Sequence, residues 1–134
     1  QEDPRMKIPD LHDLESAGVL EYRGTADAVA EAAAAAGLEC LTVDLARASS
    51  KRSLLAAFAD GLRLPEHFGE NWDALADCLE DGDWLGKAGA VVRIAHSAAY
   101  RKAHPNDWET AEEILTEAAE FWRERHVPFW VLVG

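Results

Sequence analysis

A run of acidic residues between Leu64 and Asp83 holds the side chains of this sequence that are best spaced for chemistry. Asp73 and Asp77 lie four residues apart and Glu80 follows one turn later, while the stretch LPEHFGENWDALADCLEDGD contains no lysine or arginine. Paired carboxylates could act as a general acid and base or could bind a divalent cation. They could also form a face for a cationic partner, because like charges at this spacing repel each other on a helix and so cost stability.

Catalysis and metal binding are chemistries that these carboxylates could support in principle. General acid–base catalysis needs a carboxyl group whose pKa is raised in an apolar cleft, whereas helical spacing puts these groups on an exposed face. A magnesium site usually collects carboxylates from separate elements. The sequence also has no glycine-rich phosphate loop and no pair of histidines at i,i+4. We expect no catalytic residue, metal or cofactor; an enzymatic or metal-binding domain using Glu70, Asp73 and Asp77 is the alternative from another class.

The charge of the whole chain narrows the choice of partner. Its 134 residues include 13 basic and 25 acidic side chains, and the formal net charge is −12. Such a chain is repelled by nucleic acid and by anionic membranes and is attracted by basic proteins. The length suits one domain, and a hydrophobic content of 49% with five tryptophans is enough for a core. No apolar run approaches the ~20 residues that cross a bilayer.

The cysteines and the first residues bear on the cellular compartment. Cys40 and Cys78 form neither a disulfide framework nor a zinc-ligand spacing. The N-terminal residues do not resemble a signal peptide. Because disulfides are rare in the reducing cytoplasm, we expect free thiols and a cytoplasmic protein.

Strand and helix patterns alternate along the chain after a polar segment, residues 1–17, that we expect to be flexible. Strands are predicted over residues 18–24, 38–45, 89–96 and 127–134. Helices are predicted from Asn71 onward and over residues 25–37, 51–62 and 105–125, with a short helix or turn over 97–104. Apolar strands separated by helices are typical of a parallel sheet covered by helices, so the expected fold class is α/β.

The helix that follows Asn71 is predicted to be amphipathic. At helical spacing Trp72, Leu75 and Leu79 share one side, and the acidic residues occupy the other. Asn71 is a favourable N-cap, and the helix dipole favours an acid in the first turn. The dipole does not account for Asp77, which lies farther along. The acidic stripe is therefore either a solvated face or a binding face for cations.

The segment from Leu64 to Leu79 carries a more specific signal than its charge. It reads LPEHFGENWDALADCL and closely resembles the barstar signature L-P-x-[aromatic]-[aromatic]-G-x-N-x-D-A-L-x-D-x-L. Barstars are intracellular inhibitors of secreted, guanyl-specific bacterial ribonucleases. The resemblance implies a single barstar-like α/β domain over residues 18–134, with three core strands in a small parallel sheet. Residues 18–38 would add an N-terminal strand and helix, as in longer actinobacterial members of the family.

The resemblance also implies roles for residues of the signature. Asp77 would enter the nuclease active site and occupy the position of a substrate phosphate. Asp73 would contact basic residues around the guanine-recognition loop, and Asn71 and Gly69 would position the helix and supply backbone contacts. The physics is compatible with these roles, because a rigid helix with carboxylates about 6 Å apart can mimic successive phosphates.

Some positions depart from the family pattern and suggest a different partner surface. His67 and Ala76 stand where barstar has a tyrosine and a tryptophan. Phe68 and Trp72 would replace part of the lost aromatic area. Glu80 would lie nearer the rim of the contact.

One acidic residue on the last long helix also contributes to binding in the family. Glu120 is the nearest match here, with Glu117 and Glu124 one turn to either side. The resemblance therefore implies a contact from this helix without fixing which of the three makes it.

We therefore expect an inhibitor of a secreted guanyl-specific ribonuclease, of the barnase or the streptomycete type. It would form a 1:1 complex and block the active site with the acidic helix and its preceding loop. It would be monomeric when free and would bind neither nucleic acid nor membranes. An immunity protein against another basic toxin is the alternative of the same structural class.

Overall fold

The structure is a computed structural model of the 134-residue chain, and it describes residues 4–64, 71–81 and 88–134. Four strands form one sheet in the order β1-β4-β3-β2, and every neighbouring pair is parallel. The strands are β1 (Val19–Glu21), β2 (Glu39–Asp44), β3 (Ala90–Ala95) and β4 (Phe129–Val133). The predicted α/β class, with three core strands and an N-terminal strand in a parallel sheet, is confirmed.

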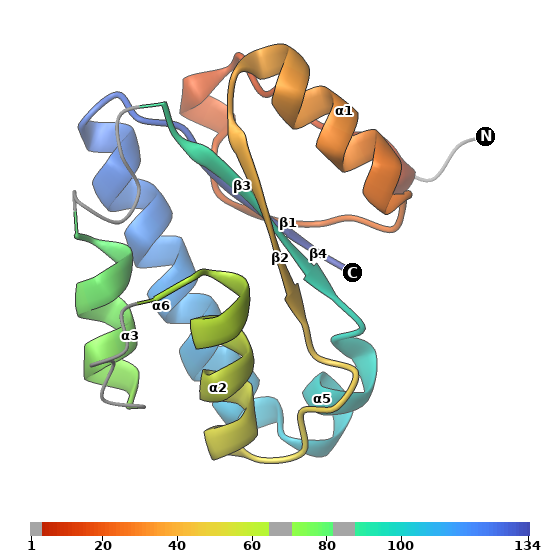
Figure 1. Ribbon diagram of the computed structural model, residues 1–134, viewed down its shortest axis with the longest axis vertical. Coiled ribbons are helices and arrows are strands. Elements are labelled where there is room, and N and C mark those ends of the chain that lie inside the picture. Colours follow the sequence, from red (N-terminus) through yellow and green to blue (C-terminus); the bar gives the residue numbers. More distant parts are fainter. Residues whose placement is uncertain (1–3, 65–70, 82–87) are drawn as a thin grey trace.

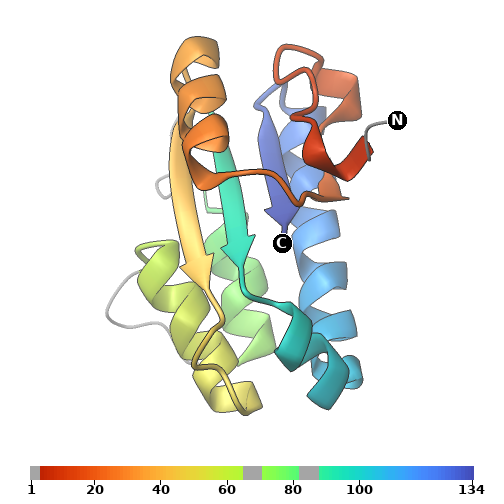
Figure 2. The ribbon, with the colours of Figure 1, turned by 90° about the vertical axis from the view of Figure 1, so that its right-hand side faces the viewer.

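Helices cover both faces of this sheet, as parallel strands require (Figure 1). Figure 2 shows α1 and the N-terminal segment in front of one face, while α2, α3 and α6 lie behind the other. Two short 3-10 turns precede β1. The bounds are η1 (Pro4–Met6), η2 (Leu14–Ser16), α1 (Ala26–Ala36), α2 (Lys51–Gly61), α3 (Trp72–Leu79), α5 (Ala98–Ala103) and α6 (Pro105–Glu124).

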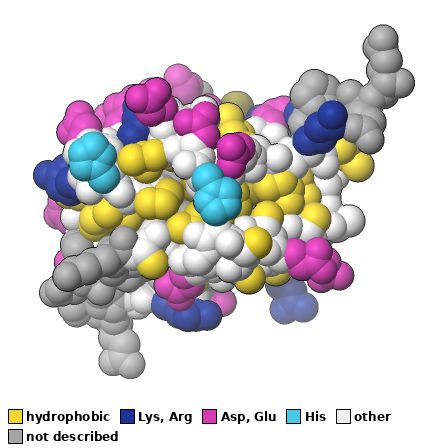
Figure 3. All heavy atoms as spheres, turned by 90° about the horizontal axis from the view of Figure 1, so that it is seen from above, with side chains coloured by type: hydrophobic (Ala, Val, Ile, Leu, Met, Phe, Trp, Pro, Cys, Tyr) yellow, Lys and Arg dark blue, Asp and Glu magenta, His cyan; other side chains and the backbone are white. Residues whose placement is uncertain are grey.

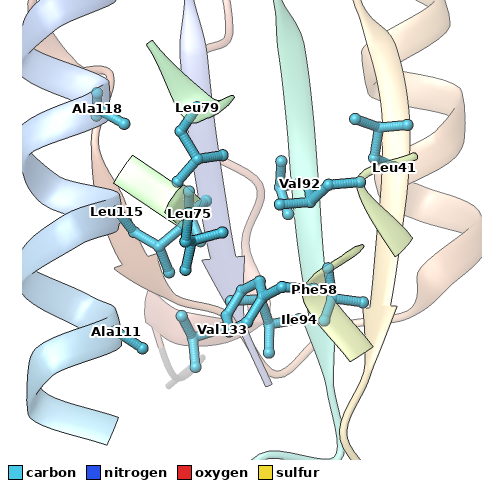
Figure 4. Close-up of a cluster of buried hydrophobic side chains, with 14 of the residues drawn as sticks. Leu41, Phe58, Leu75, Leu79, Val92, Ile94, Ala111, Leu115, Ala118 and Val133 are labelled. Carbon is cyan, nitrogen blue, oxygen red and sulfur yellow. The ribbon is translucent and has the colours of Figure 1, made fainter. Parts of the chain in front are cut away.

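The larger of two hydrophobic clusters holds α3 in place. Leu75 and Leu79 of α3 are fully buried, and they lie among Leu115 of α6, Phe58 of α2 and Ile94 of β3 (Figure 4). Burying a leucine side chain stabilises a fold by roughly 1.5–3 kcal/mol. The inner side of α3 is therefore a structural anchor that leaves its outer side available.

The smaller cluster lies on the opposite face of the sheet. Val29 and Ala33 of α1 pack there with Val91, Trp130 and Leu132 of the two central strands. Odd and even positions of a strand face opposite sides, so β3 and β4 supply both clusters. This explains why their sequences are apolar almost without interruption.

The N-terminal segment departs from the prediction that residues 1–17 are flexible, since part of it is packed. Leu11 and Ala17 are buried in the smaller cluster, with Ile8 beside them. The guanidinium of Arg123 on α6 donates hydrogen bonds to the carbonyl oxygens of Glu15 (3.4 Å) and Ala17 (3.2 Å). These few apolar residues, widely spaced among polar ones, give no periodic signal, yet they belong to the smaller cluster.

No helix in the part of the chain that the structure describes has the length and apolar character needed to cross a membrane. Across residues 4–64, 71–81 and 88–134, no group of His, Cys, Asp and Glu side chains is arranged to hold a metal ion. Cys40 and Cys78 are both free and half-buried.

Candidate partner-binding face

The acidic helix α3 starts at a side-chain cap. The Oδ1 atom of Asn71 accepts a hydrogen bond of 2.8 Å from the backbone N–H of Ala74. This satisfies one of the four N–H groups that the first turn of a helix leaves without a partner. The predicted N-cap is therefore confirmed, and it fixes where the first acidic residue, Asp73, falls.

The far end of α3 is held by α6. The indole Nε1 of Trp122 donates a buried hydrogen bond of 2.7 Å to the carbonyl oxygen of Leu79. Leu79 is the last residue of the helix, where carbonyl groups have no partner within the helix. Cap and anchor together fix α3 at both ends, so its outer side is presented rigidly.

The outer side of α3 carries the two aspartates of the signature. Asp73 and Asp77 are exposed, whereas Leu75 and Leu79 are fully buried, so the predicted division of the helix into two sides is confirmed. Ala76 is half-buried between them. Because the side chain of Ala76 is small, the helix has no large side chain at this position between the two aspartates in the sequence.

Glu80 does not continue the acidic stripe as the sequence predicted. The helix ends at Leu79, and Glu80 is its half-buried C-cap, with φ −99° and ψ 9°. Its N–H still reaches the carbonyl oxygen of Ala76 at 3.2 Å. The helix is therefore short, and the exposed stripe on it consists of Asp73 and Asp77.

The electrostatic surroundings of α3 are negative. Among the residues that the structure describes, none forms an ion pair with Asp73 or Asp77. Burial raises the pKa of the Cys78 thiol, and the carboxylates of Asp81 and Asp77 raise it further. The two aspartates are thus free to meet cations from outside.

The nearby Lys51 lies over the Trp72 ring and is not among the described ion-pair partners of Asp73 and Asp77. Lys51, the first residue of α2, places its Nζ 5.6 Å from the centre of the Trp72 ring. Trp72 itself is half-buried and packs against the larger cluster. The expectation that Trp72 lies partly in the core is therefore confirmed, and its ring has a cationic neighbour that the sequence did not reveal.

The other predicted contact residues lie in the segment before α3 and on α6. His67, Phe68 and Gly69, together with Glu70, fall outside the described residues. On α6 the three candidate glutamates Glu117, Glu120 and Glu124 are all exposed. α6 packs beside α3, so a partner that covers α3 can also reach α6 (Figure 1).

Acidic side chains are not confined to α3. Figure 3 shows several of them along one edge of the face at the amino ends of the strands, beside exposed hydrophobic atoms. α6 also carries many, at Glu109, Glu112, Glu113, Glu117, Glu120 and Glu124. Asp73 and Asp77 differ from these acids in lying on the helix of the signature segment.

Sequence reasoning missed the residue that anchors α3. Trp122 is one of the buried residues of α6. Its indole N–H needs a hydrogen-bond acceptor once the ring is buried, and that requirement was the available signal. Which acceptor it finds depends on the packing of two helices far apart in the sequence.

The fold and this helix agree with a comparison against protein families. Residues 38–134 match the family Barstar, described as barnase inhibitor. The matched part begins just before β2 and runs to the end of β4, so it includes α3 and its anchor on α6. The chain belongs to the barstar family. A comparison with curated proteins gives no significant match.

The family supplies a class of activity for the chain. Barstars inhibit ribonucleases of the barnase type by binding them, and they are generally not enzymes. Residues before 38 lie outside the match. The division of residues 18–134 into a family core and an added unit at 18–38 therefore stays a prediction.

Proposed function

We propose that this protein inhibits a secreted, guanyl-specific ribonuclease by placing α3 in the active site of the nuclease. The observation that carries the proposal is the exposure of Asp73 and Asp77 without an ion pair among the described residues. A ribonuclease must present cationic side chains to hold its polyanionic substrate. Two carboxylates one helical turn apart match successive phosphates in charge and spacing.

Rigidity supports the same proposal. Asn71 caps one end of α3 and Trp122 holds the other, so little conformational freedom remains to be lost on binding. Asp77 would lie deepest among the cations of the nuclease, and Asp73 would meet basic residues near the guanine-recognition loop. Ala76, Glu80 and Glu120 would border the contact.

Electrostatic attraction would also accelerate the encounter. A net charge of −12 favours association with a basic protein and disfavours binding to nucleic acid or anionic membranes. The inhibitor would act as a monomer in a 1:1 complex. It would work in the cytoplasm, where it protects the cell that makes the nuclease.

The alternative is an immunity protein that blocks a different basic toxin. It is favoured by two positions of the signature, His67 and Ala76, where the resemblance implies a tyrosine and a tryptophan. Losing two large polar aromatic side chains would change the surface that a partner must fit.

Titration of ribonuclease activity separates these functions. Adding the protein to barnase, and in parallel to a streptomycete guanyl-specific ribonuclease, should abolish cleavage at one equivalent of at least one of them. Calorimetry should give a 1:1 stoichiometry for that enzyme. Full ribonuclease activity of both enzymes in the presence of excess protein would reject the proposed function and favour the immunity alternative.

A further inference from the structure

A second site is marked by a pocket of about 400 Å³ far from the outer side of α3. It is lined by the ends of β1, β3 and β4, by the turn after β1 and by the start of α5. The volume falls within the range of roughly 300–1,000 Å³ that is usual for small-molecule sites. Nothing in the inhibition described above uses this pocket.

The position of the pocket follows from the order of the strands. β1 and β3 lie on either side of β4. The chain leaves β1 toward α1 on one face of the sheet and leaves β3 toward α5 and α6 on the other (Figures 1 and 2). Two connections that diverge in this way open a crevice at the carboxyl ends of the strands, which is where parallel α/β sheets bind ligands.

The charge of the lining is opposite to that of the protein. Its charged side chains are three arginines and one carboxylate, namely Arg23, Arg93, Arg101 and Glu21. Acidic residues outnumber basic ones 25 to 13 in the whole chain. A cationic hollow in so acidic a protein attracts anions locally, because low-dielectric walls concentrate the field of the charges that line them.

Among the described residues, two of the three arginines form no ion pair. Arg101 donates to Glu21 at 3.0 Å and lies 5.5 Å from the centre of the Trp108 ring. Within the residues that the structure describes, neither Arg23 nor Arg93 forms an ion pair. Arg93 acts on Asp44 without an ion pair, since its charge helps to lower the pKa of that carboxyl group. The guanidinium groups of both arginines therefore keep their hydrogen-bond donors for a ligand.

Arg93 is unusual because it interrupts an otherwise apolar central strand. It is the one residue of β3 that is not buried, and it follows Val91 on the side of the sheet that faces α1. α1 crosses that side near the amino ends of the strands, and no helix lies over the carboxyl ends in Figure 2. Arg93 is thus half-buried and lines the pocket, where a bound anion would be partly shielded from water.

The walls of the pocket are fixed by local contacts. The N–H and Oγ of the buried Ser97 donate hydrogen bonds of 3.0 and 2.7 Å to the carbonyl oxygen of Gly134. His96, with φ 59°, lines the pocket while its Nδ1 lies 2.9 Å from Oδ1 of Asp44. In the turn after β1, a Cβ at Gly24 would lie 2.2 Å from the Tyr22 hydroxyl. The turn that carries Arg23 is therefore tight.

We propose that this pocket binds a small molecule bearing a phosphate group, held by Arg23 and Arg93. Guanidinium groups recognise phosphate through paired, charge-assisted hydrogen bonds. Two guanidiniums without an ion pair among the described residues match the charge of a phosphate monoester. The pocket has room for more than the phosphate itself, so the remainder of the molecule would contact the ends of β3 and β4.

Calorimetry of the whole protein at constant ionic strength tests this proposal, with inorganic phosphate and AMP as the probes. Saturable binding is expected, with a Kd of about 1 mM or tighter for AMP and weaker binding for inorganic phosphate. Amide resonances of Gly24, Ser97 and Gly134 should shift with the same midpoint. Absence of saturable binding by both probes would overturn the proposal.

Charge-matched variants locate the site. Arg23→Gln and Arg93→Gln should each weaken AMP binding by roughly tenfold or more, because each removes a charge-assisted contact. Arg47→Gln removes the same charge from an exposed position outside the pocket and should leave binding unchanged. Arg23 is exposed, so its variant should fold even if Arg93→Gln is destabilised. Native-like binding by Arg23→Gln, or an equal loss in Arg47→Gln, would contradict the assignment.

Discussion

The indole nitrogen of Trp122 and the carbonyl oxygen of Leu79 lie 2.7 Å apart in a buried hydrogen bond that joins α6 to the last residue of α3. Each group satisfies the hydrogen-bonding requirement of the other. A buried indole N–H needs an acceptor, and the last carbonyl groups of a helix need donors. The contact thereby connects the stability of the fold to the position of Asp73 and Asp77.

Replacing Trp122 by phenylalanine should show how much this hydrogen bond contributes to the free energy of unfolding, apart from the packing of the ring. The carbonyl oxygen of Leu79 would lose its donor, which generally costs roughly 1–3 kcal/mol for a buried group. Trp130→Phe is the matched control, because no described residue accepts a hydrogen bond from its buried indole nitrogen. Urea unfolding of both variants measures the difference. A loss for Trp130→Phe as large as that for Trp122→Phe would show that the hydrogen bond contributes nothing beyond ring volume.

Asn71→Ala should weaken both the fold and the inhibition. The N-cap hydrogen bond to Ala74 would be lost, at a typical cost of about 1 kcal/mol, and the first turn of α3 would fray. Asn71→Ser keeps a capping side chain and should recover most of the loss. Thermal unfolding and the inhibition constant should therefore change together, and an unchanged melting temperature in Asn71→Ala would show that the cap is not needed.

Association with the ribonuclease should slow as salt is added. Charges on exposed side chains steer an encounter over about one Debye length, which is ~10 Å at 0.1 M ionic strength. Stopped-flow measurements over a range of sodium chloride concentrations report this directly. The dissociation rate should change less than the association rate. An association rate that is equal at low and physiological ionic strength would argue against charge mimicry.

The raised pKa of Tyr100 predicts that the protein loses stability at alkaline pH. Burial and the carboxylate of Asp107, whose Oδ2 lies 3.4 Å from the hydroxyl, raise the pKa of Tyr100 to about 12 from its ordinary value of 10. The folded state therefore favours the protonated phenol. Its contribution to stability is complete below pH 10 and is lost as the pH rises from 10 to about 12. Tyr100→Phe should remove this part of the decline in urea unfolding at high pH, and an identical decline in the variant would refute the assignment.

Local signals were sufficient to predict the fold class and the two sides of α3. Capping by Asn71, and the spacing of Leu75 and Leu79 against Asp73 and Asp77, are properties of one short segment. The parallel sheet followed from apolar strands alternating with helices. These features depend on neighbours in the sequence, and the family signature reinforced them.

Features that depend on tertiary packing could not be predicted. The helix was expected to extend through Glu80, but it ends where Leu79 meets Trp122 of a distant helix. Leu11 packs in a cluster with residues of α1, β3 and β4. Arg93 is visible in the sequence as a charge in an apolar strand, yet its place in one pocket with Arg23 follows from the strand order, which no local pattern encodes.

The most direct test of the central claim compares inhibition by Asp77→Ala and Glu80→Ala, using barnase or whichever guanyl-specific ribonuclease the protein blocks. Glu31→Ala, an exposed acid on α1, is the control for net charge. Asp77→Ala should leave desolvated cations of the nuclease without a partner. Such a loss generally costs roughly 2–5 kcal/mol, a range partly set by charge pairs between barnase and barstar themselves.

Glu80, at the half-buried end of the helix, should matter by roughly 0–1 kcal/mol, as an ion pair at the rim does. Glu31→Ala should leave inhibition unchanged. Melting temperatures should stay near that of the parent protein, because Asp77→Ala removes repulsion from Asp73. The account predicts a large rise of the inhibition constant for Asp77→Ala alone. Equal, small changes for Asp77→Ala, Glu80→Ala and Glu31→Ala would contradict it.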